Sequence, residues 1–214
     1  IYASSAATYG DGSLGYKDDE NEIEKLRPLN MYGYSKQMFD LWLKKMEIDE
    51  KVVGLKFFNV YGPNEYHKGE MRSVINKAYE QITAAGEVSL FKSYKEEYKD
   101  GEQKRDFIYV NNAVEMILHF FENNEKNGLF NVGTGTARTW NDLVTAIFKV
   151  LGKTPKINYI DMPEGMRDKY QYFTQADIEK IRNAGYSKPI TSLEEGIKDY
   201  ITNYLQKNKY IGLS

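Results

Sequence analysis

The chain carries the sequence Tyr-Gly-Tyr-Ser-Lys at residues 32–36, at the start of a predicted helix over about 31–47. Residues four apart share one helical face, so Tyr32 and Lys36 point the same way. That face continues to Phe39 and Leu43, which are predicted to face the core. We therefore expect Tyr32 and Lys36 to look toward a sheet rather than toward water. The helical spacing rests on four apolar residues: Phe39, Trp42, Leu43 and Met46.

Strands and helices alternate around this helix, which indicates an α/β fold with a mainly parallel sheet. The predicted strands cover residues 1–4, 52–58, 88–92, 107–110, 129–132 and 157–160. Further helices are predicted over about 71–84, 111–124 and 139–152, with two more beginning near residues 174 and 192. Two polar stretches, 10–27 and 93–105, are predicted to be loops. Thr139 with Asp142 and Ser192 with Glu195 have the spacing of helix N-caps.

Composition narrows the class of protein. The 214 residues allow one large domain, or one domain with a small lobe, and 41% apolar residues can build a sizeable core. The 29 basic and 31 acidic residues nearly balance, which argues against nucleic-acid binding. No cysteine and no long apolar run are present, so we expect a cytoplasmic protein without disulfides or a metal site. Because a strand begins at residue 1, we expect an N-terminal part to be missing.

The Tyr-x-x-x-Lys spacing suits proton transfer. A neighbouring ammonium favours the phenolate form of tyrosine, so such a pair can act as a general base near neutral pH. The spacing alone is common on helices by chance. Ser4 and Ser5 end the first strand, however, and Asn59 follows another strand end, where ligands bind in parallel sheets. The two serines could equally satisfy the backbone of the turn.

Three motifs in this order resemble the extended short-chain dehydrogenase/reductase family of sugar-nucleotide epimerases and dehydratases. They are Ala-Ser-Ser-Ala-Ala-Thr-Tyr-Gly at 3–10, Pro-Leu-Asn-Met-Tyr-Gly-Tyr-Ser-Lys at 28–36 and Phe-Asn-Val-Tyr-Gly-Pro at 58–63. More selective stretches are similar to the branch that inverts C6 of an ADP-heptose. They are His-Lys-Gly at 67–69, Arg-Asp-Phe at 105–107 and Tyr-Gln-Tyr-Phe-Thr-Gln-Ala-Asp at 170–177.

The resemblance implies the C-terminal part of a Rossmann-like, doubly wound parallel sheet with a smaller α/β substrate-binding lobe. Residues 1–62 would belong to the NADP-binding domain. Residues 63–214 would mostly form the lobe, with about 105–150 returning to the Rossmann domain. The implied enzyme is an isomerase that inverts C6 of ADP-D-glycero-D-manno-heptose through a transient ketone with bound NADP. It would form homo-oligomers, and this chain alone would be inactive.

The resemblance also implies a role for each matching position. Tyr32 and Lys68 would be the two acid/base groups, with Ser5 as the catalytic serine and Lys36 tuning Tyr32. Tyr32, Lys36, Val60 and Lys68 would contact the cofactor. Arg105 suits a diphosphate because a guanidinium grips two oxygens at once. The substrate-binding residues would be Asn59, Glu70, Lys77, Phe91, Lys92, Ser93, Tyr94, Arg105 and Tyr170.

The chain departs from the family pattern at several positions. Glu70 stands where the family often has a small polar residue, Lys77 stands where it has a histidine, and the 93–105 loop is longer. No G-x-G-x-x-G is present, and Gly133-Thr134-Gly135 is too short to replace it. The choice between NADP and NAD belongs to the absent ribose-binding segment.

Alternative functions stay open at this point. One is another sugar-nucleotide epimerase, such as a UDP-sugar 4-epimerase. A 4,6-dehydratase is less favoured, because Ser5-Ala6-Ala7 stands where that group has Thr-Asp-Glu. A non-catalytic Rossmann-like binding module is the third, although such modules usually lose the tyrosine or the lysine.

Overall fold

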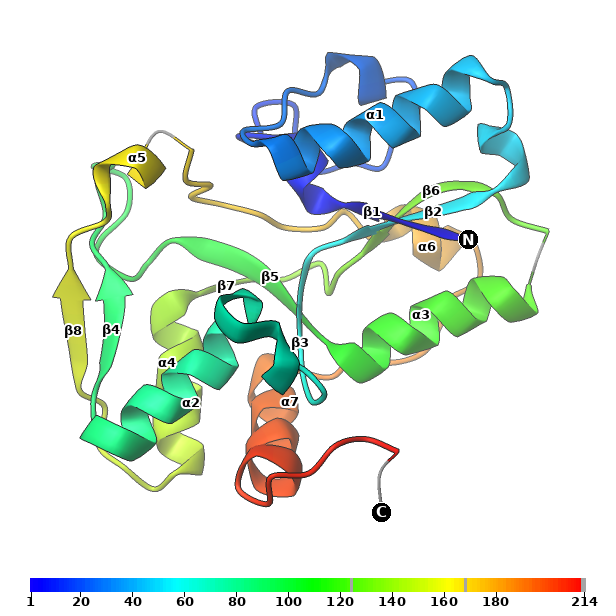
Figure 1. Cartoon of the computed structure of the whole chain (residues 1–214). Helices are drawn as coiled ribbons and strands as arrows, with labels where there is room; N and C mark the ends of the chain where they lie inside the picture. The colour runs from blue at the N-terminus through cyan, green and yellow to red at the C-terminus, as the bar shows by residue number, and fades with distance from the viewer. Residues whose placement is uncertain (124, 168, 213–214) are drawn as a thin grey trace.

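A parallel three-stranded sheet organises the part of the molecule that carries the first helix (Figure 1). In the computed structural model, which describes residues 1–123, 125–167 and 169–212, this sheet has the strand order β1-β2-β6. Its strands are β1 (Tyr2–Ser5), β2 (Val53–Phe57) and β6 (Gly128–Val132). Ser5 pairs with Phe57 and Phe57 with Val132, so the three strands end side by side. This sheet therefore places the ends of β1 and β2 at one edge, where ligands bind in such folds.

Helices cover both faces of this sheet, which Figure 1 shows nearly edge-on. Helix α1 (Met31–Lys45) lies on one face and α3 (Val110–Glu122) on the other, with α6 (Glu179–Asn183) beside β6. Asn30 caps α1, because its side chain accepts a hydrogen bond from the Gly33 amide at 2.9 Å. The α3 side has an apolar core that includes Leu55, Ile108, Met116 and Phe130.

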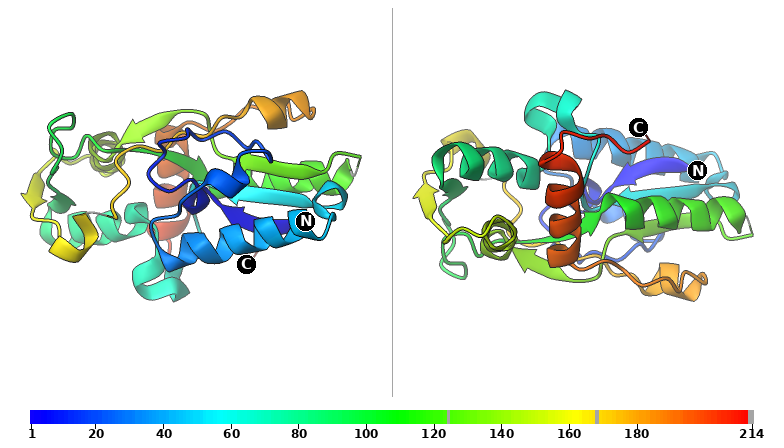
Figure 2. Two further views of the ribbon diagram at one scale, coloured as in Figure 1. Left: turned by 90° about the horizontal axis from the view of Figure 1, so that it is seen from above. Right: turned by 90° about the horizontal axis from the view of Figure 1, so that it is seen from below.

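A second group of elements forms the lobe seen on the left of Figure 1 and in both views of Figure 2. Strand β5 (Lys104–Tyr109) lies between β3 (Asn59–Tyr61), which is parallel to it, and β7 (Ala137–Thr139), which is antiparallel. Strands β4 (Val88–Phe91) and β8 (Ile157–Ile160) form a parallel pair. The helices are α2 (Val74–Ala85), α4 (Trp140–Val150), α5 (Glu164–Arg167) and α7 (Leu193–Asp199), with η5 (Tyr200–Leu205) continuing α7.

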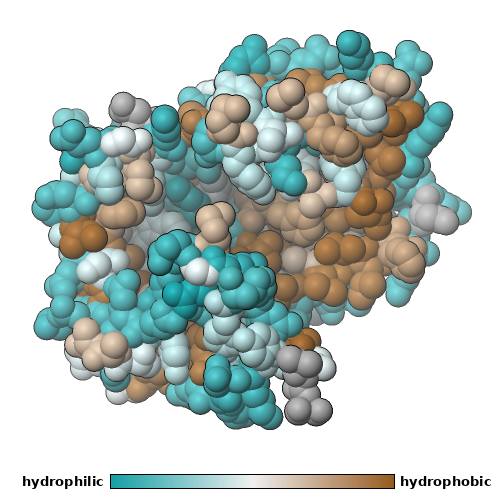
Figure 3. Space-filling view, viewed as in Figure 1, coloured by the Kyte–Doolittle hydropathy of each residue, from teal (hydrophilic) through white to brown (hydrophobic). Residues whose placement is uncertain are grey.

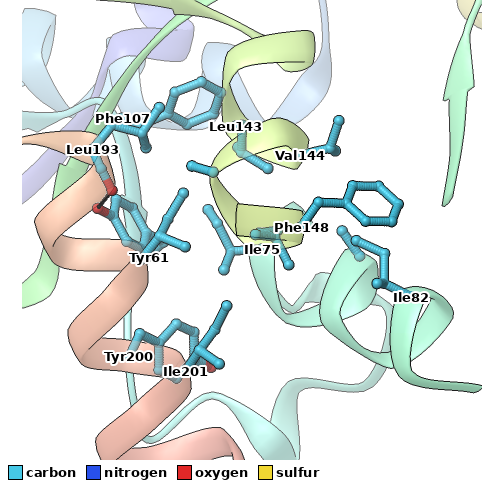
Figure 4. Packing of buried hydrophobic residues seen from close by; sticks show 14 of the residues in the cluster. Tyr61, Ile75, Ile82, Phe107, Leu143, Val144, Phe148, Leu193, Tyr200 and Ile201 are labelled. Atoms are coloured by element: carbon cyan, nitrogen blue, oxygen red, sulfur yellow. Dashed lines mark hydrogen bonds between the residues drawn. The ribbon is translucent and has the colours of Figure 1, made fainter. Parts of the chain in front are cut away.

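One large apolar cluster holds this lobe together (Figure 4). Side chains from α2, α4, α7 and η5 meet there, among them Ile75, Phe148 and Ile201, which are almost fully buried. Tyr61 joins β3 to the cluster, and its hydroxyl donates to the Leu193 carbonyl at 3.3 Å. The described residues also contain four 3-10 turns: η1 (Ala6–Tyr9), η2 (Ile23–Lys25), η3 (Asp49–Lys51) and η4 (Tyr66–Met71). Within the described ranges, every helix is too short or too polar to cross a membrane.

The predicted α/β class is confirmed, and most predicted elements occur within a few residues of their expected bounds. Both N-caps are confirmed as capping boxes, Thr139 with Asp142 and Ser192 with Glu195. Residue 124, the predicted end of one helix, lies outside the described residues. Some predictions were wrong. The strand expected at 107 begins at Lys104, inside the expected loop, and the helix expected near 174 begins at Glu179. Strands β3 and β7 and helix α5 were not predicted.

The predicted buried face of α1 is confirmed at Leu43 and was wrong at Phe39. Phe39, Trp42 and Met46 are 44–53% exposed, whereas the buried residues are Gly33, Gln37, Asp40 and Leu43. The polar members of this buried face find partners in other segments. The Gln37 side chain donates to the carbonyls of Ile23 and Leu26, both at 2.9 Å. In Figure 3, apolar side chains gather on the right of the molecule, over β1 and parts of α1 and α3.

Candidate active site

The site begins where β1 turns into η1. Ser5 is the N-cap of this turn and is buried, and its hydroxyl oxygen accepts a hydrogen bond from the Ala7 amide at 3.1 Å. A serine hydroxyl that accepts from the backbone still has its own hydrogen to donate. Ser5 is thus oriented by its own turn, and its O–H can be offered to a ligand oxygen. Ser4 is turned away, because its hydroxyl donates to the Asp40 carboxylate at 2.8 Å.

Tyr32 and Lys36 lie in the first turns of α1. The Lys36 ammonium is 5.9 Å from the centre of the Tyr32 ring and donates to the Ala3 carbonyl at 3.0 Å. The two residues are therefore on one face, as predicted. The prediction that they look away from water was wrong for Tyr32, which is 57% exposed. An exposed phenol with an ammonium beside it can exchange protons with a ligand that binds over this end of α1.

Close packing fixes the first turn of α1 against η1. A methyl group at Gly33 would lie 2.7 Å from the Ala7 carbonyl oxygen and 2.8 Å from the Pro28 Cβ. Only a residue without a Cβ allows this approach. Gly33 adjoins Tyr32, and Ala7 follows Ser5 by two residues. The glycine thus sets how near the proposed serine and tyrosine can come.

Arg105 is buried, with only 7% of the residue exposed. Its guanidinium donates to the carbonyls of Lys104, at 2.8 Å, and Gln171. The rings of Tyr170 and Trp140 lie 5.1 and 5.7 Å away. Among the described residues, no carboxylate forms an ion pair with Arg105, although a buried cation normally has an anionic partner. Burial lowers the pKa of Arg105, but an arginine stays protonated at neutral pH.

Arg105 lines one cavity, and its neighbours Trp140 and Tyr170 line a second. The smaller, of about 160 Å³, is lined by Arg105 and Tyr170 together with Ala7 of η1 and Asn30, the cap of α1. The larger, of about 360 Å³, is mostly apolar and lies among α2, β4 and Ile160. Tyr170 and the predicted residues Lys77 and Phe91 are part of its wall. Figure 3 shows the surface hollowed between this lobe and the part that carries α1.

Tyr170 links the two cavities. It lines both of them, and its hydroxyl accepts a hydrogen bond from Trp140 Nε1 at 2.9 Å. Burial raises the pKa of Tyr170, so it is a neutral phenol at physiological pH. A line of groups therefore runs from Ala7 of η1 and the cap of α1, past Arg105 and Tyr170, to the apolar cavity.

Four other predicted substrate residues line neither of these two cavities: Glu70, Lys92, Ser93 and Tyr94. Lys77 forms an ion pair with Glu70 at 3.2 Å, so the acid that departs from the family pattern faces a lysine. Lys92 pairs with Asp161 at 3.1 Å, and the Tyr94 hydroxyl donates to the same carboxylate at 3.0 Å. The Ser93 amide donates to Asp100 at 2.7 Å. The beginning of the 93–105 stretch is therefore held by hydrogen bonds across it.

Three predicted residues follow the end of β2. Asn59 and Val60 are exposed in the short strand β3, and Val60 is 37% exposed. Lys68 is exposed in η4, where its amide donates to the Glu65 carbonyl at 3.0 Å. No contact among the described residues joins Lys68 to Tyr32, so the structure does not bring this pair together directly.

The Gly133-Thr134-Gly135 turn is occupied by a side chain. Asp106, next to Arg105 on β5, accepts hydrogen bonds from the amides of Thr134, Gly135 and Ala176 at 2.8–3.0 Å. Burial raises the pKa of Asp106, whereas these hydrogen bonds oppose the rise. The turn therefore serves to anchor the strand that carries Arg105.

Sequence reasoning missed two residues of this site. Trp140 contacts both Arg105 and Tyr170, but in the sequence it is only the first residue after a helix cap. The Gln171 side chain donates to the Gly10 carbonyl and so ties the Tyr170 segment to the loop after Ser5. These contacts join residues thirty or more positions apart, and no local spacing reveals them.

Comparison with known proteins places this geometry in a family. The model of the NAD dependent epimerase/dehydratase family matches residues 1–133, more than half of the chain. The chain therefore belongs to the NAD-dependent epimerase/dehydratase family.

Three similar proteins carry the name ADP-L-glycero-D-manno-heptose-6-epimerase. The protein of that name from Nitratidesulfovibrio vulgaris (strain DP4) is 58% identical over 96% of this chain and 64% of its own length. The one from Fusobacterium nucleatum is 52% identical over 97% of this chain and 65% of its own length. The crystal structure of the Helicobacter pylori enzyme has a TM-score of 0.78 and 34% identity, covering 95% of this chain and 58% of that one. The chain thus spans about two thirds of the length of these curated relatives.

Proposed function

We propose that the protein containing this chain inverts C6 of ADP-D-glycero-D-manno-heptose to give the L-glycero epimer. The observation that carries the proposal is the line from η1 and the cap of α1 to Arg105, Tyr170 and the apolar cavity. The end near α1 suits the sugar, Arg105 suits the diphosphate, and the apolar cavity suits the flat base. A nucleotide sugar presents these groups in the same order. The similarity to relatives named for this reaction favours ADP-heptose over other nucleotide sugars.

Arg105 is the proposed diphosphate ligand. Two of its five N–H donors are used by backbone carbonyls, and its charge stands in a cavity wall. A diphosphate would supply the negative charge that a buried guanidinium needs. The apolar cavity bounded by Val88, Leu90 and Phe91 is the proposed place of the base. Lys77 stands at this end of the line, where a histidine stands in the family pattern.

The residues near α1 fit the ribose and nicotinamide end of a dinucleotide. The Lys36 ammonium has three donors, and its contact with Ala3 uses one of them. Val60 offers exposed apolar surface just beyond the end of β2. When bound, NADP would supply the hydride chemistry at C6. We propose NADP rather than NAD from the family resemblance, and mass spectrometry of the nucleotide released on denaturing the purified protein tests that choice.

Proton exchange is the proposed task of Tyr32 and Lys68. Inversion requires the sugar to react in two orientations, so one group must serve each face. Tyr32 would take the C6 hydroxyl proton in one orientation, with Ser5 donating a hydrogen bond to the same oxygen. Lys68 would serve the other orientation. Both side chains are exposed and lie on different elements, α1 and η4, as two bases for opposite faces require.

The test uses the protein expressed from its complete reading frame. We would incubate it with ADP-D-glycero-D-manno-heptose without added cofactor and follow the C6 configuration by proton NMR. Conversion to the L-glycero epimer is expected. If nothing is converted even after NADP⁺ is added, the heptose assignment is wrong, and a panel of UDP-sugars decides whether a 4-epimerase replaces it.

A second experiment tests the two-base assignment. Lys68→Ala is expected to lower kcat by a factor of about 10²–10⁴ while the bound nucleotide is retained. Lys45→Ala, which removes an exposed lysine from α1, is the matched control and should leave kcat unchanged. A Lys68→Ala protein with wild-type activity would exclude Lys68 as a base.

A further inference from the structure

A buried ion pair lies beneath the proposed catalytic groups. Lys56 of β2 and Asp40 of α1 are 3.5 Å apart, and both side chains are only 1% exposed. Charges are rarely buried so completely, because removing each from water costs several kcal/mol. Burial lowers the pKa of Lys56, and the adjacent Asp40 opposes that change by favouring the ammonium.

Each member of the pair also holds a second segment. Asp40 accepts hydrogen bonds from the hydroxyls of Tyr2, at 3.0 Å, and Ser4, at 2.8 Å, both on β1. The Lys56 ammonium donates to the Thr8 hydroxyl of η1 at 2.8 Å and lies 4.7 Å from the centre of the Tyr9 ring. The pair therefore joins β1, η1, α1 and β2.

The chain from Lys56 continues to the proposed catalytic serine. Thr8 is fully buried, and its hydroxyl accepts from Lys56 and donates to the Ser5 carbonyl at 2.8 Å. The ammonium thus reaches Ser5 through one hydroxyl. On the other side, Asp40 lies one helical turn after Lys36, on the buried face of α1. Lys56 holds η1, which follows Ser5, and Asp40 belongs to α1, which carries Tyr32. This pair consequently sets the spacing between η1 and α1.

Stability alone does not account for the pair. Replacing a buried ion pair by apolar residues of similar volume is often neutral or stabilising. An apolar contact would, however, let η1 slide over β2, because such contacts have no direction. The hydrogen bonds from Lys56 to Thr8 and from Thr8 to Ser5 have fixed directions and so specify one position of the turn.

We propose that Lys56, through Asp40 and Thr8, is a positioning residue that sets Ser5 against Tyr32 for catalysis. This inference rests on the proposed epimerase function. It predicts that loss of the network lowers kcat more than it raises KM, because substrate contacts remain while the reacting geometry is displaced. A misplacement of this kind costs about tenfold to a hundredfold in rate.

The test compares two substitutions of Thr8 in the protein from the complete reading frame. Thr8→Val keeps the shape but removes the hydroxyl, whereas Thr8→Ser keeps the hydroxyl and removes a methyl group. Thr8→Val is expected to lose about tenfold or more in kcat, with KM within about twofold, and Thr8→Ser to stay near wild type. If the residue only filled space, Thr8→Ser would be the more damaged variant. That ranking, or wild-type kcat in Thr8→Val, would overturn the proposal.

A double variant tests the pair itself. Lys56→Met/Asp40→Asn removes both charges together, so neither is left buried alone. The asparagine oxygen can accept from one of the two hydroxyls, of Tyr2 and Ser4, and its NH2 group can donate to the other. It is expected to fold and to show the same loss of kcat. Lys44→Met removes another lysine of α1, which pairs with Glu24 of η2 at 3.1 Å, and serves as the control with wild-type kcat. If the double variant does not fold, the comparison of Thr8→Val with Thr8→Ser still tests the proposal.

Hydrogen exchange separates failure of this proposal from failure of the proposed reaction. The amides of Ala7 and Gly10 form hydrogen bonds within the turn, to the Ser5 hydroxyl and the Ala7 carbonyl. Their exchange is expected to be about tenfold faster in Thr8→Val than in Thr8→Ser. If the wild-type protein does not epimerise the heptose, this measurement still tests the positioning. Equal exchange in the two variants would overturn it.

Discussion

Gly33→Ala tests how closely α1 packs against η1, the turn that follows Ser5. Inside a helix, alanine is favoured over glycine by about 1 kcal/mol. At Gly33, however, the new methyl group would lie 2.7 Å from the Ala7 carbonyl oxygen and 2.8 Å from the Pro28 Cβ, so α1 or η1 must move. Overpacking of this kind costs about 1–3 kcal/mol. We expect a net loss of stability of about 0–2 kcal/mol.

Gly165→Ala is the matched control. Gly165 is also helical, in α5, and a methyl group there meets no atom within 4 Å. The helix preference should therefore act alone and stabilise this variant by up to about 1 kcal/mol. Urea unfolding of both variants gives the difference, expected at about 1–3 kcal/mol in favour of Gly165→Ala with unchanged m-values. Equal stability of the two proteins would refute the close seating of α1 on η1.

Two further predictions concern stability. Thr139→Ala removes the cap of α4 and should cost about 1 kcal/mol in urea unfolding, whereas Thr139→Ser, which keeps the hydroxyl, should cost less. Burial raises the pKa of Asp18 to about 6, so the folded protein holds a proton that the unfolded chain releases at about pH 4. Stability from this group is present below pH 4 and is lost as pH rises through 6, by about 2–3 kcal/mol. Asp18→Asn should remove this loss, and an unchanged pH dependence would show that Asp18 is not its source.

Local signals in the sequence predicted the elements well. A cap such as Thr139 with Asp142 acts within one helical turn, and the alternation of strands and helices follows from short apolar stretches. The strand over 157–160 and the cap at Ser192 are therefore visible without any tertiary information. The motifs around Ser5 and Tyr32 likewise gave the two segments that pack together at Gly33.

The burial of Arg105 and the start of β5 depend on residues that are distant in the sequence. Arg105 stands in a charged stretch, and only its contacts with Trp140, Tyr170 and Gln171 bury it. Strand β5 begins early because Lys104 pairs with Thr139, a residue of β7 that is thirty-five positions away. Distant pairing of this kind leaves no period in the sequence, so the boundaries of β5 and the burial of Arg105 could not be predicted.

The misassigned face of α1 has a more specific cause. Periodicity assigns the buried side of a helix to its apolar residues, whereas α1 buries Gln37 and Asp40 and exposes Phe39. A buried polar residue is tolerated only where partners from other segments satisfy it, and Asp40 has such partners in Tyr2, Ser4 and Lys56. Natural proteins break the local rules mainly at functional sites. The failure of periodicity at Asp40 therefore points to the same place as the Tyr-x-x-x-Lys motif, although the two observations are independent of each other.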